Sequence, residues 1–239
     1  MTTPDLSVVF PLFNEAESIP TLIAELHQAL DRRPWRWEMI AVNDGSTDQS
    51  LEVLRAMRSE DPSLRIISLE RNSGQTAALD AGWRAARGRY VVSIDADLQN
   101  DPADIPPMVD QLEGLGVDMV IGMRANRRDG RWKRMQSKIG NAVRNWITRD
   151  RVTDTGCSLK VVRREVIDRV RLFHGMHRFL PTLVRLEGFS VIEVPVNHRP
   201  RRYGASSYGA MNRATRGLID CFVVRWMSRR ALRYRTIEE

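Results

Sequence analysis

Cysteine is scarce in this sequence, and the two that are present lie far apart. Among 239 residues, only Cys157 and Cys221 carry thiols. Two distant cysteines provide neither a disulfide framework nor the ligand spacing of a structural metal site. The first residues also lack the charged and apolar regions of a signal peptide. These absences favour a cytoplasmic protein with reduced thiols.

Long apolar runs are missing as well. No stretch approaches the roughly 20 apolar residues that a membrane-spanning helix needs. The longest candidate, from Leu218 to Met227, contains Asp220 and Arg225. The sequence therefore predicts no transmembrane segment.

Two common phosphate-binding fingerprints are absent. The chain has no Gly-x-Gly-x-x-Gly motif and no Gly-Lys-Ser/Thr loop. Standard dinucleotide-binding and P-loop sites are therefore excluded. A phosphate-bearing ligand would have to be held by a metal ion and arginine side chains instead.

Positive charge is abundant and concentrated late in the chain. The formal net charge is +7 and the sequence pI is about 10.1, with most of the excess in residues 124–151 and 199–235. Such charge indicates an anionic partner, either nucleic acid, an anionic lipid surface or a phosphorylated substrate. Nucleic acid is disfavoured because no binding module is present and the carboxylates described below would repel its backbone.

Apolar and amphipathic segments alternate along the chain. We expect strands at residues 6–10, 38–43, 64–69, 90–94, 118–122 and 189–195. Helices are expected at residues 16–30, 49–60, 75–87, 102–115, 131–149 and 161–170. A strand-helix-strand series of this kind predicts an α/β fold with a mostly parallel central sheet.

The stretch that follows the fourth expected strand carries the clearest chemistry. Asp95, Asp97 and Gln99 come directly after the apolar run from Tyr90 to Ile94. Carboxylate and amide oxygens are hard ligands that suit Mg²⁺ or Mn²⁺ carrying substrate phosphates. Ligands of open α/β folds bind at the carboxyl ends of the strands, so a metal site is here as well supported as an ordinary solvated loop.

Other expected strands also end in polar residues. Asn14 and Glu15, Asp44, and Asn72 each follow a strand. Any one of them could belong to an ordinary polar loop. Together with Asp95 and Asp97, they predict a polar cleft at one edge of the sheet.

The motifs at these strand ends resemble those of the family 2 glycosyltransferases, which have the GT-A fold. Their order and spacing, over roughly residues 6–210, are similar to the polyprenyl-phosphate branch that includes dolichol-phosphate mannose synthases. The matching stretches are Pro11-x-Phe13-Asn14-Glu15, Asp44-Gly-Ser-x-Asp48, Arg71-Asn72-x-Gly74, Asp95-Ala96-Asp97-Leu-Gln99 and Arg201-x-Tyr203-Gly204.

The resemblance implies a metal-dependent, inverting transfer of a sugar from a nucleotide-diphosphate sugar to a polyprenyl phosphate of the undecaprenyl type. It places Mg²⁺ or Mn²⁺ on Asp95, Asp97 and Gln99, and phosphate groups against Arg124 and Arg201. The remaining implied nucleotide-sugar contacts are Pro11, Phe13, Glu15, Val42, Asp44 and Ala96. Asp97, Asp154 and Arg201 are the implied catalytic residues.

The acceptor remains open at this point. A phosphate monoester is already ionised near neutral pH, whereas a sugar hydroxyl needs a general base. Asp154 is the one candidate for that base. A transferase acting on a saccharide hydroxyl, in polysaccharide or lipopolysaccharide synthesis, is therefore the alternative. The sequence departs from the family at Ser207, where a Lys is common, and at Asn43, where many relatives have Asp.

Two basic amphipathic segments complete the expected organisation. Residues 131–149 form an apolar stripe flanked by basic residues, which suits either a core-facing or a membrane-interfacial helix, and the family resemblance favours the membrane. We assign residues 1–210 to the catalytic domain and residues 211–239 to a basic amphipathic helix and tail. That helix could lie on an anionic membrane, cap the domain or pair with a second subunit in a homo-oligomer. We expect peripheral attachment to the cytoplasmic face of the inner membrane.

His174 and His177 are a further pair of possible metal ligands. They have a spacing that can bind metal, but no carboxylate or cysteine clusters near them in the sequence. We therefore predict no metal site there.

Overall fold

A computed structural model of the chain describes residues 3–124, 131–203 and 211–230, without the side chains of residues 131–139 and 211–216. The described residues form one sheet in the order β3-β2-β1-β4-β6-β5-β7. Its strands are β1 (Leu6–Leu12), β2 (Trp37–Asn43), β3 (Leu64–Ser68), β4 (Tyr90–Ser93), β5 (Met119–Arg124), β6 (Lys160–Arg163) and β7 (Val191–Val196). All neighbours pair in parallel except β6, which runs antiparallel to β4 and β5. The predicted α/β fold with a mostly parallel sheet is confirmed.

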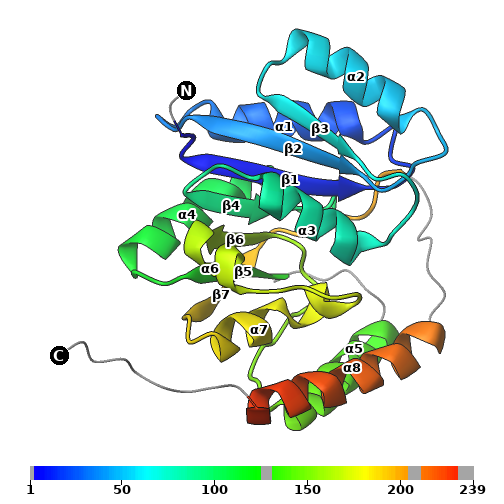
Figure 1. The fold of residues 1–239 in the computed structure, drawn as a ribbon, viewed down its shortest axis with the longest axis vertical. Coiled ribbons are helices and arrows are strands. Elements are labelled where there is room, and N and C mark those ends of the chain that lie inside the picture. Colours follow the sequence, from blue (N-terminus) through cyan, green and yellow to red (C-terminus); the bar gives the residue numbers. More distant parts are fainter. Residues whose placement is uncertain (1–2, 125–130, 204–210, 231–239) are drawn as a thin grey trace.

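Helices cover both faces of this sheet (Figure 1). They are α1 (Ile19–Leu30), α2 (Ser50–Glu60), α3 (Gln75–Ala85), α4 (Ile105–Gly114), α5 (Arg131–Thr148), α6 (Arg164–Arg169), α7 (Leu180–Leu186) and α8 (Met211–Arg230), with short 3₁₀ turns η1 (Pro102–Asp104) and η2 (Met176–Phe179). Apolar residues of α1, α2 and α4 pack on one face, and those of α3, α6 and α7 pack on the other.

The core follows from alternation along the central strands. In β1, Val8 and Phe10 belong to the core on one face, whereas Val9 belongs to the core on the other. Removing these side chains from water is the main source of stability. Trp83 of α3 is also fully buried, and its indole Nε1 donates a hydrogen bond of 2.8 Å to Ser93 Oγ in β4.

The expected helix at residues 161–170 is wrong in its first part. Residues 160–163 form β6, and only residues 164–169 are helical. Val161 and Val162 are fully buried between β4 and β5. A short apolar run buried on both faces has no periodicity that separates strand from helix. The strand places Lys160 opposite Ser93 in the register of the sheet, and this matters for the site below.

Helices α5 and α8 pack against each other at one end of the molecule (Figure 1). Ile147 of α5 and Val224 of α8 belong to the core on that side. Val143, Trp146, Leu218, Ile219, Phe222, Val223 and Trp226 are large apolar residues of the two helices that remain exposed. Val143 and Trp146 of the predicted α5 stripe are thus exposed, whereas the adjacent Ile147 faces the core. No helix among the described residues is long and apolar enough to cross a membrane.

Several predictions concern residues outside this description. Ser207, the side chains of Trp132, Met135 and Ile139, and the tail after Arg230 all lie outside it. The proposed boundary near residue 210 is likewise untested and stays a prediction.

Candidate active site at the carboxyl edge of the sheet

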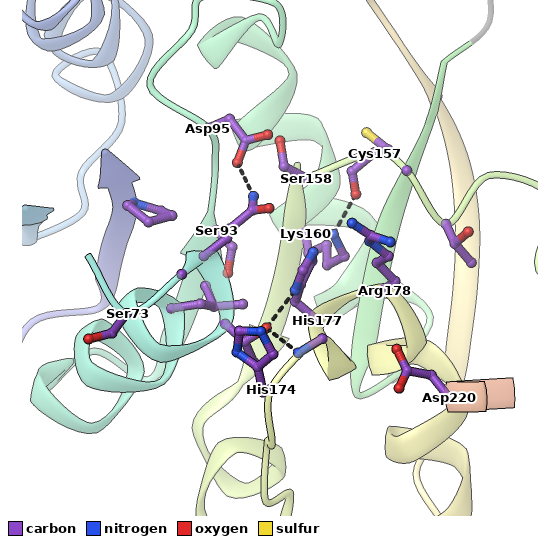
Figure 2. Close-up of a pocket in the computed structure, with 18 of the residues that line it drawn as sticks. Ser73, Ser93, Asp95, Cys157, Ser158, Lys160, His174, His177, Arg178 and Asp220 are labelled. Carbon is purple, nitrogen blue, oxygen red and sulfur yellow. Dashed lines mark hydrogen bonds between the residues drawn. The ribbon is translucent and has the colours of Figure 1, made fainter. Parts of the chain in front are cut away.

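A cavity of about 850 Å³ opens where the carboxyl ends of β1 and β4 meet the loop after β3 (Figure 2). Pro11 and Asp95 line it from the strand ends. The rest of the lining comes from residues 72–76 and 79, 93–94, 155–158 and 160, 174–175 and 177–178, and 219–220. Its size suits a small-molecule substrate, and its position is the one expected for ligands of an open α/β sheet.

Asp95 projects from the end of β4 into this cavity. Its Oδ1 accepts a hydrogen bond of 2.9 Å from Gln75 Nε2. Burial, followed by repulsion from neighbouring Asp97, raises the pKa of Asp95 above its usual range. A cation bound at this strand end would therefore be stabilised by two carboxylates.

Asp97 lies beside Asp95 and contacts a residue from far along the chain. Arg201 Nη2 lies 2.8 Å from Asp97 Oδ2, and Arg201 Nη1 lies 3.5 Å from Glu15 Oε1. Burial also raises the pKa of Glu15. Between Asp97 and Gln99, Leu98 is buried with φ of 61°, a left-handed conformation that a non-glycine residue adopts only when its surroundings hold it there.

The loop that carries Arg201 is attached to the loop that carries Asp97. Arg199 donates its backbone N–H to Gln99 O at 2.8 Å, and Asn100 forms a β-bridge with His198. The Arg199 guanidinium also lies 2.7 Å from both Asp101 and Glu25. These contacts hold the Arg201 segment against the end of β4.

Asp44 shapes the opposite side of the site. Its two carboxylate oxygens accept the backbone N–H groups of Ser73 and Gly74, at 2.7 and 2.9 Å. Asp44 is buried and so fixes the loop whose residues line the cavity. The adjacent Gly45 has φ of +67°, and a Cβ there would lie 2.6 Å from the backbone of Arg71 and Asn72.

Arg124 and Asp154 form a two-pronged ion pair. Arg124 Nε and Nη2 each donate to one Asp154 oxygen, both at 2.7 Å. Both side chains are largely buried, with 15% and 7% of their areas exposed. Gly156 permits this close approach, because a Cβ there would lie 2.6 Å from Arg124 Nη2.

The structure therefore separates the predicted site residues into groups. Pro11 and Asp95 line the cavity, while Glu15, Asp97 and Arg201 meet beside it. The side chains of Val42 and Ala96 are buried in the core and are not among the cavity residues, so their contact with a nucleotide sugar stays a prediction. Phe13 is half-buried and is not among the cavity residues. Gln99 contacts Asp97 through a hydrogen bond that its backbone N–H donates to Asp97 Oδ1.

Within the described part of the chain, no cluster of three or more His, Cys, Asp or Glu side chains is arranged to hold a metal.

Sequence reasoning did not assign several polar residues of the cavity to the site, including Gln75, Lys160, His177 and Arg178. Lys160 directly precedes the expected helix at residues 161–170, and that helix prediction left it outside the sheet, whereas it begins β6. His177 lines the cavity, and its Nδ1 shares a hydrogen bond of 2.6 Å with Thr76 Oγ1.

Comparison with known proteins agrees with this geometry. Residues 7–171 match the family model described as glycosyl transferase family 2. The chain belongs to this family. It is a glycosyltransferase, and its relatives include enzymes named for polyprenyl-phosphate sugar transfer.

Two curated relatives illustrate that branch. Dodecaprenyl-phosphate galacturonate synthase of Rhizobium johnstonii is 42% identical over 94% of this chain and 68% of its own length. Undecaprenyl-phosphate 4-deoxy-4-formamido-L-arabinose transferase of Pseudomonas fluorescens is 37% identical over 86% of this chain and 60% of its own length. The chain thus spans about two thirds or less of the length of these relatives.

Solved structures with the GT-A fold are similar as well. Glucosyl-3-phosphoglycerate synthase of Mycobacterium tuberculosis, in complex with Mn²⁺ and UDP-glucose, has a TM-score of 0.70 at 21% identity, over 93% of this chain and 79% of that one. A mannosyltransferase of Pyrobaculum calidifontis, in complex with GDP-mannose and Mn²⁺, has a TM-score of 0.61 at 21% identity, over 82% and 56%. At this identity the likeness establishes the fold.

Proposed function

We propose that this glycosyltransferase moves a sugar from a nucleotide-diphosphate sugar to a polyprenyl phosphate, with inversion at the anomeric carbon. The observation that carries the proposal is the meeting of Asp97, Glu15 and Arg201 beside the cavity that Asp95 lines. The names of the two curated relatives support the lipid phosphate as acceptor.

The donor set at the end of β4 fits a divalent cation. Asp95 and Asp97 offer carboxylate oxygens, and burial, followed by repulsion from Asp97, raises the pKa of Asp95. Mg²⁺ typically takes one or two carboxylates and completes its shell with phosphate oxygens and water, so a larger protein cluster is not required. When bound, such an ion would stabilise charge on the departing nucleotide diphosphate.

Arg201 supplies the protein's own positive charge at this place. Its guanidinium bridges Asp97 and Glu15, each through a different nitrogen. A guanidinium binds phosphate through paired hydrogen bonds. We propose that Arg201 turns from these carboxylates to a substrate phosphate when the donor binds.

The acceptor argument favours the phosphate over a saccharide hydroxyl. Both oxygens of Asp154, the expected base for a hydroxyl acceptor, are engaged by Arg124. An ionised phosphate monoester requires no such base. Within this proposal, Asp154 positions Arg124 and does not remove a proton.

The surface of α5 and α8 supports attachment to an anionic membrane. Trp146 and Trp226 are 82% and 62% exposed, and the basic Arg229 and Arg230 are exposed near the end of α8. Exposed aromatic residues beside basic ones suit a lipid-water interface. We propose peripheral attachment at the cytoplasmic membrane face, which would bring the cavity near a lipid-borne acceptor.

The test is a transfer assay with defined donors and acceptors. Purified protein is incubated with Mg²⁺ or Mn²⁺ and a panel of UDP- and GDP-sugars, with or without undecaprenyl phosphate. We expect metal-dependent transfer only when the lipid phosphate is present. Asp97→Asn should abolish it, whereas Asp168→Asn, an exposed residue of α6, should not. Transfer to a saccharide in place of the lipid would overturn the proposed acceptor.

A further inference from the structure

A buried lysine lines the cavity at the start of β6. Lys160 is the first residue of β6, where it pairs with Ser93 of β4, two residues before Asp95. Its side chain is 7% exposed, and it lines the cavity together with His177 and Arg178 (Figure 2). Nothing in the function proposed above employs this residue.

The positive charge of Lys160 has no ion-pair partner in the described part of the chain. Its Nζ donates to Cys157 O, a neutral carbonyl. Burial lowers the pKa of Lys160, whereas the nearby carboxylates of Asp95 and Asp154 favour its charged form. An ammonium carries three N–H donors, and the described residues accept one of them. Burial of such a group is costly unless an anion compensates it.

The location of Lys160 indicates which part of a substrate would supply that anion. Two cations suited to phosphates, Arg199 and Arg201, come from the loop beside Asp97. Lys160 lies instead on the β6 side of Asp95, on a wall shared with the His174–Arg178 segment. A donor whose diphosphate lies between Asp97 and Arg201 would therefore extend its sugar into the part of the cavity that Lys160 faces.

We propose that Lys160 binds a carboxylate on the transferred sugar, so that the donor is a nucleotide-linked uronic acid. The inference rests on the proposed function, because it takes the cavity to be the donor site. A single ammonium matches a single carboxylate charge, and the hydrogen bond between them is of the strong, charge-assisted kind. A neutral hexose leaves the buried charge without compensation.

Equilibrium binding tests this without requiring transfer. Isothermal titration with Mg²⁺ and no acceptor compares matched pairs that differ only at C6, UDP-glucuronate against UDP-glucose and UDP-galacturonate against UDP-galactose. If free UDP does not bind, GDP-mannuronate and GDP-mannose replace them. We expect the acid to bind roughly 10- to 100-fold more tightly than its neutral partner. The variant Lys160→Met should remove this preference and leave the affinity for the free nucleotide unchanged.

The control variant is Arg163→Met. Arg163 is a basic residue at the other end of the same strand and does not line the cavity, so the preference for the acid should persist. Equal affinity of the wild-type protein for acid and neutral sugars would overturn the inference and leave the transferase proposal intact, even if Lys160→Met fails to fold. Loss of binding for acid and neutral donors alike in a folded Lys160→Met protein would also overturn it. Failure of every nucleotide to bind would overturn both proposals.

Discussion

Arg201 and Asp97 are 104 positions apart in the sequence, yet Nη2 of the arginine lies 2.8 Å from Oδ2 of the aspartate. The contact joins the loop after β7 to the loop after β4. It also places a guanidinium against one of the two carboxylates that we assign to a metal ion. Arg201 and the metal would thus compete for the same oxygen. Donor binding would then include a step in which the metal ion replaces the Arg201 guanidinium at Asp97.

Arg201→Gln should separate the two roles of this residue. Removing the guanidinium frees Asp97 Oδ2, so we expect Mn²⁺ to bind several-fold more tightly in the absence of nucleotide. Turnover should nevertheless fall by about 10²-fold, because a positive charge that stabilises the transition state is lost. Electron paramagnetic resonance of free Mn²⁺ measures the first effect, and a transfer assay measures the second.

The neighbouring Arg202→Gln serves as the matched control, since Arg202 is exposed. It should alter neither quantity appreciably. Unchanged metal affinity in Arg201→Gln would show that the arginine does not compete with the ion.

The buried ion pair between Arg124 and Asp154 should matter for folding. Asp154→Ala removes the carboxylate that accepts both hydrogen bonds of the guanidinium. Breaking a buried pair on one side typically costs about 3–5 kcal/mol of stability. Urea unfolding should therefore show a large loss, and Arg124→Met added to Asp154→Ala should recover part of it. Asp80→Ala breaks the exposed pair with Arg84 and should cost less than about 1 kcal/mol.

The alternation of strands and helices made the sheet predictable, and the polar strand ends indicated where the site would lie. The sequence could not show that Asp44 binds the backbone of Ser73 and Gly74, because that contact depends on the distance between two loops in space. Nor could it show that Val42 belongs to the core. Lys160 was missed for a different reason. Its strand is antiparallel, short and buried on both faces, and such a strand carries no periodic signal.

Gly45 should be required for the geometry of the Asn72 loop. Gly45→Ala places a Cβ 2.6 Å from backbone atoms of Arg71 and Asn72 at a φ of +67°. Positive φ alone costs a non-glycine residue about 1–2 kcal/mol, and the clash adds to this. We expect a lower free energy of unfolding and weaker nucleotide binding.

Gly114→Ala is the matched control for this substitution. Gly114 ends α4, and a Cβ there would meet nothing within 4 Å. That variant should be neutral or more stable by up to about 1 kcal/mol. If both variants unfold at the same urea concentration, the close approach at Gly45 is not limiting.

His27 should give stability a measurable pH dependence. Burial acts to lower the pKa of His27, but the hydrogen bonds that its ring donates to Asp61 and Asp31 outweigh it, and the pKa is raised. A raised pKa in the folded state stabilises the fold fully below the unfolded value of about 6.5. That contribution is lost as the pH rises through the folded pKa.

The variant His27→Gln isolates this contribution. The stability difference between the wild type and the variant should be larger at acidic than at alkaline pH, and should remain below about 1 kcal/mol because the side chain is partly exposed to solvent. Added salt should reduce it. A difference that does not change with pH would show that the imidazole acts through packing alone.

The exposed apolar surface of α5 and α8 gives the last prediction. Trp146 and Trp226 are exposed on adjacent helices, and inserting an indole into a lipid interface removes a large apolar area from water. The double variant Trp146→Ser, Trp226→Ser should reduce co-flotation with phosphatidylglycerol vesicles at low salt by at least about tenfold. Leu115→Ser is the control, because Leu115 is 64% exposed at the end of α4, and α4 lies away from both helices in Figure 1. If the wild-type protein stayed in the soluble fraction and sedimented as a dimer that the two substitutions dissociate, a second copy of the chain would cover this surface in place of lipid.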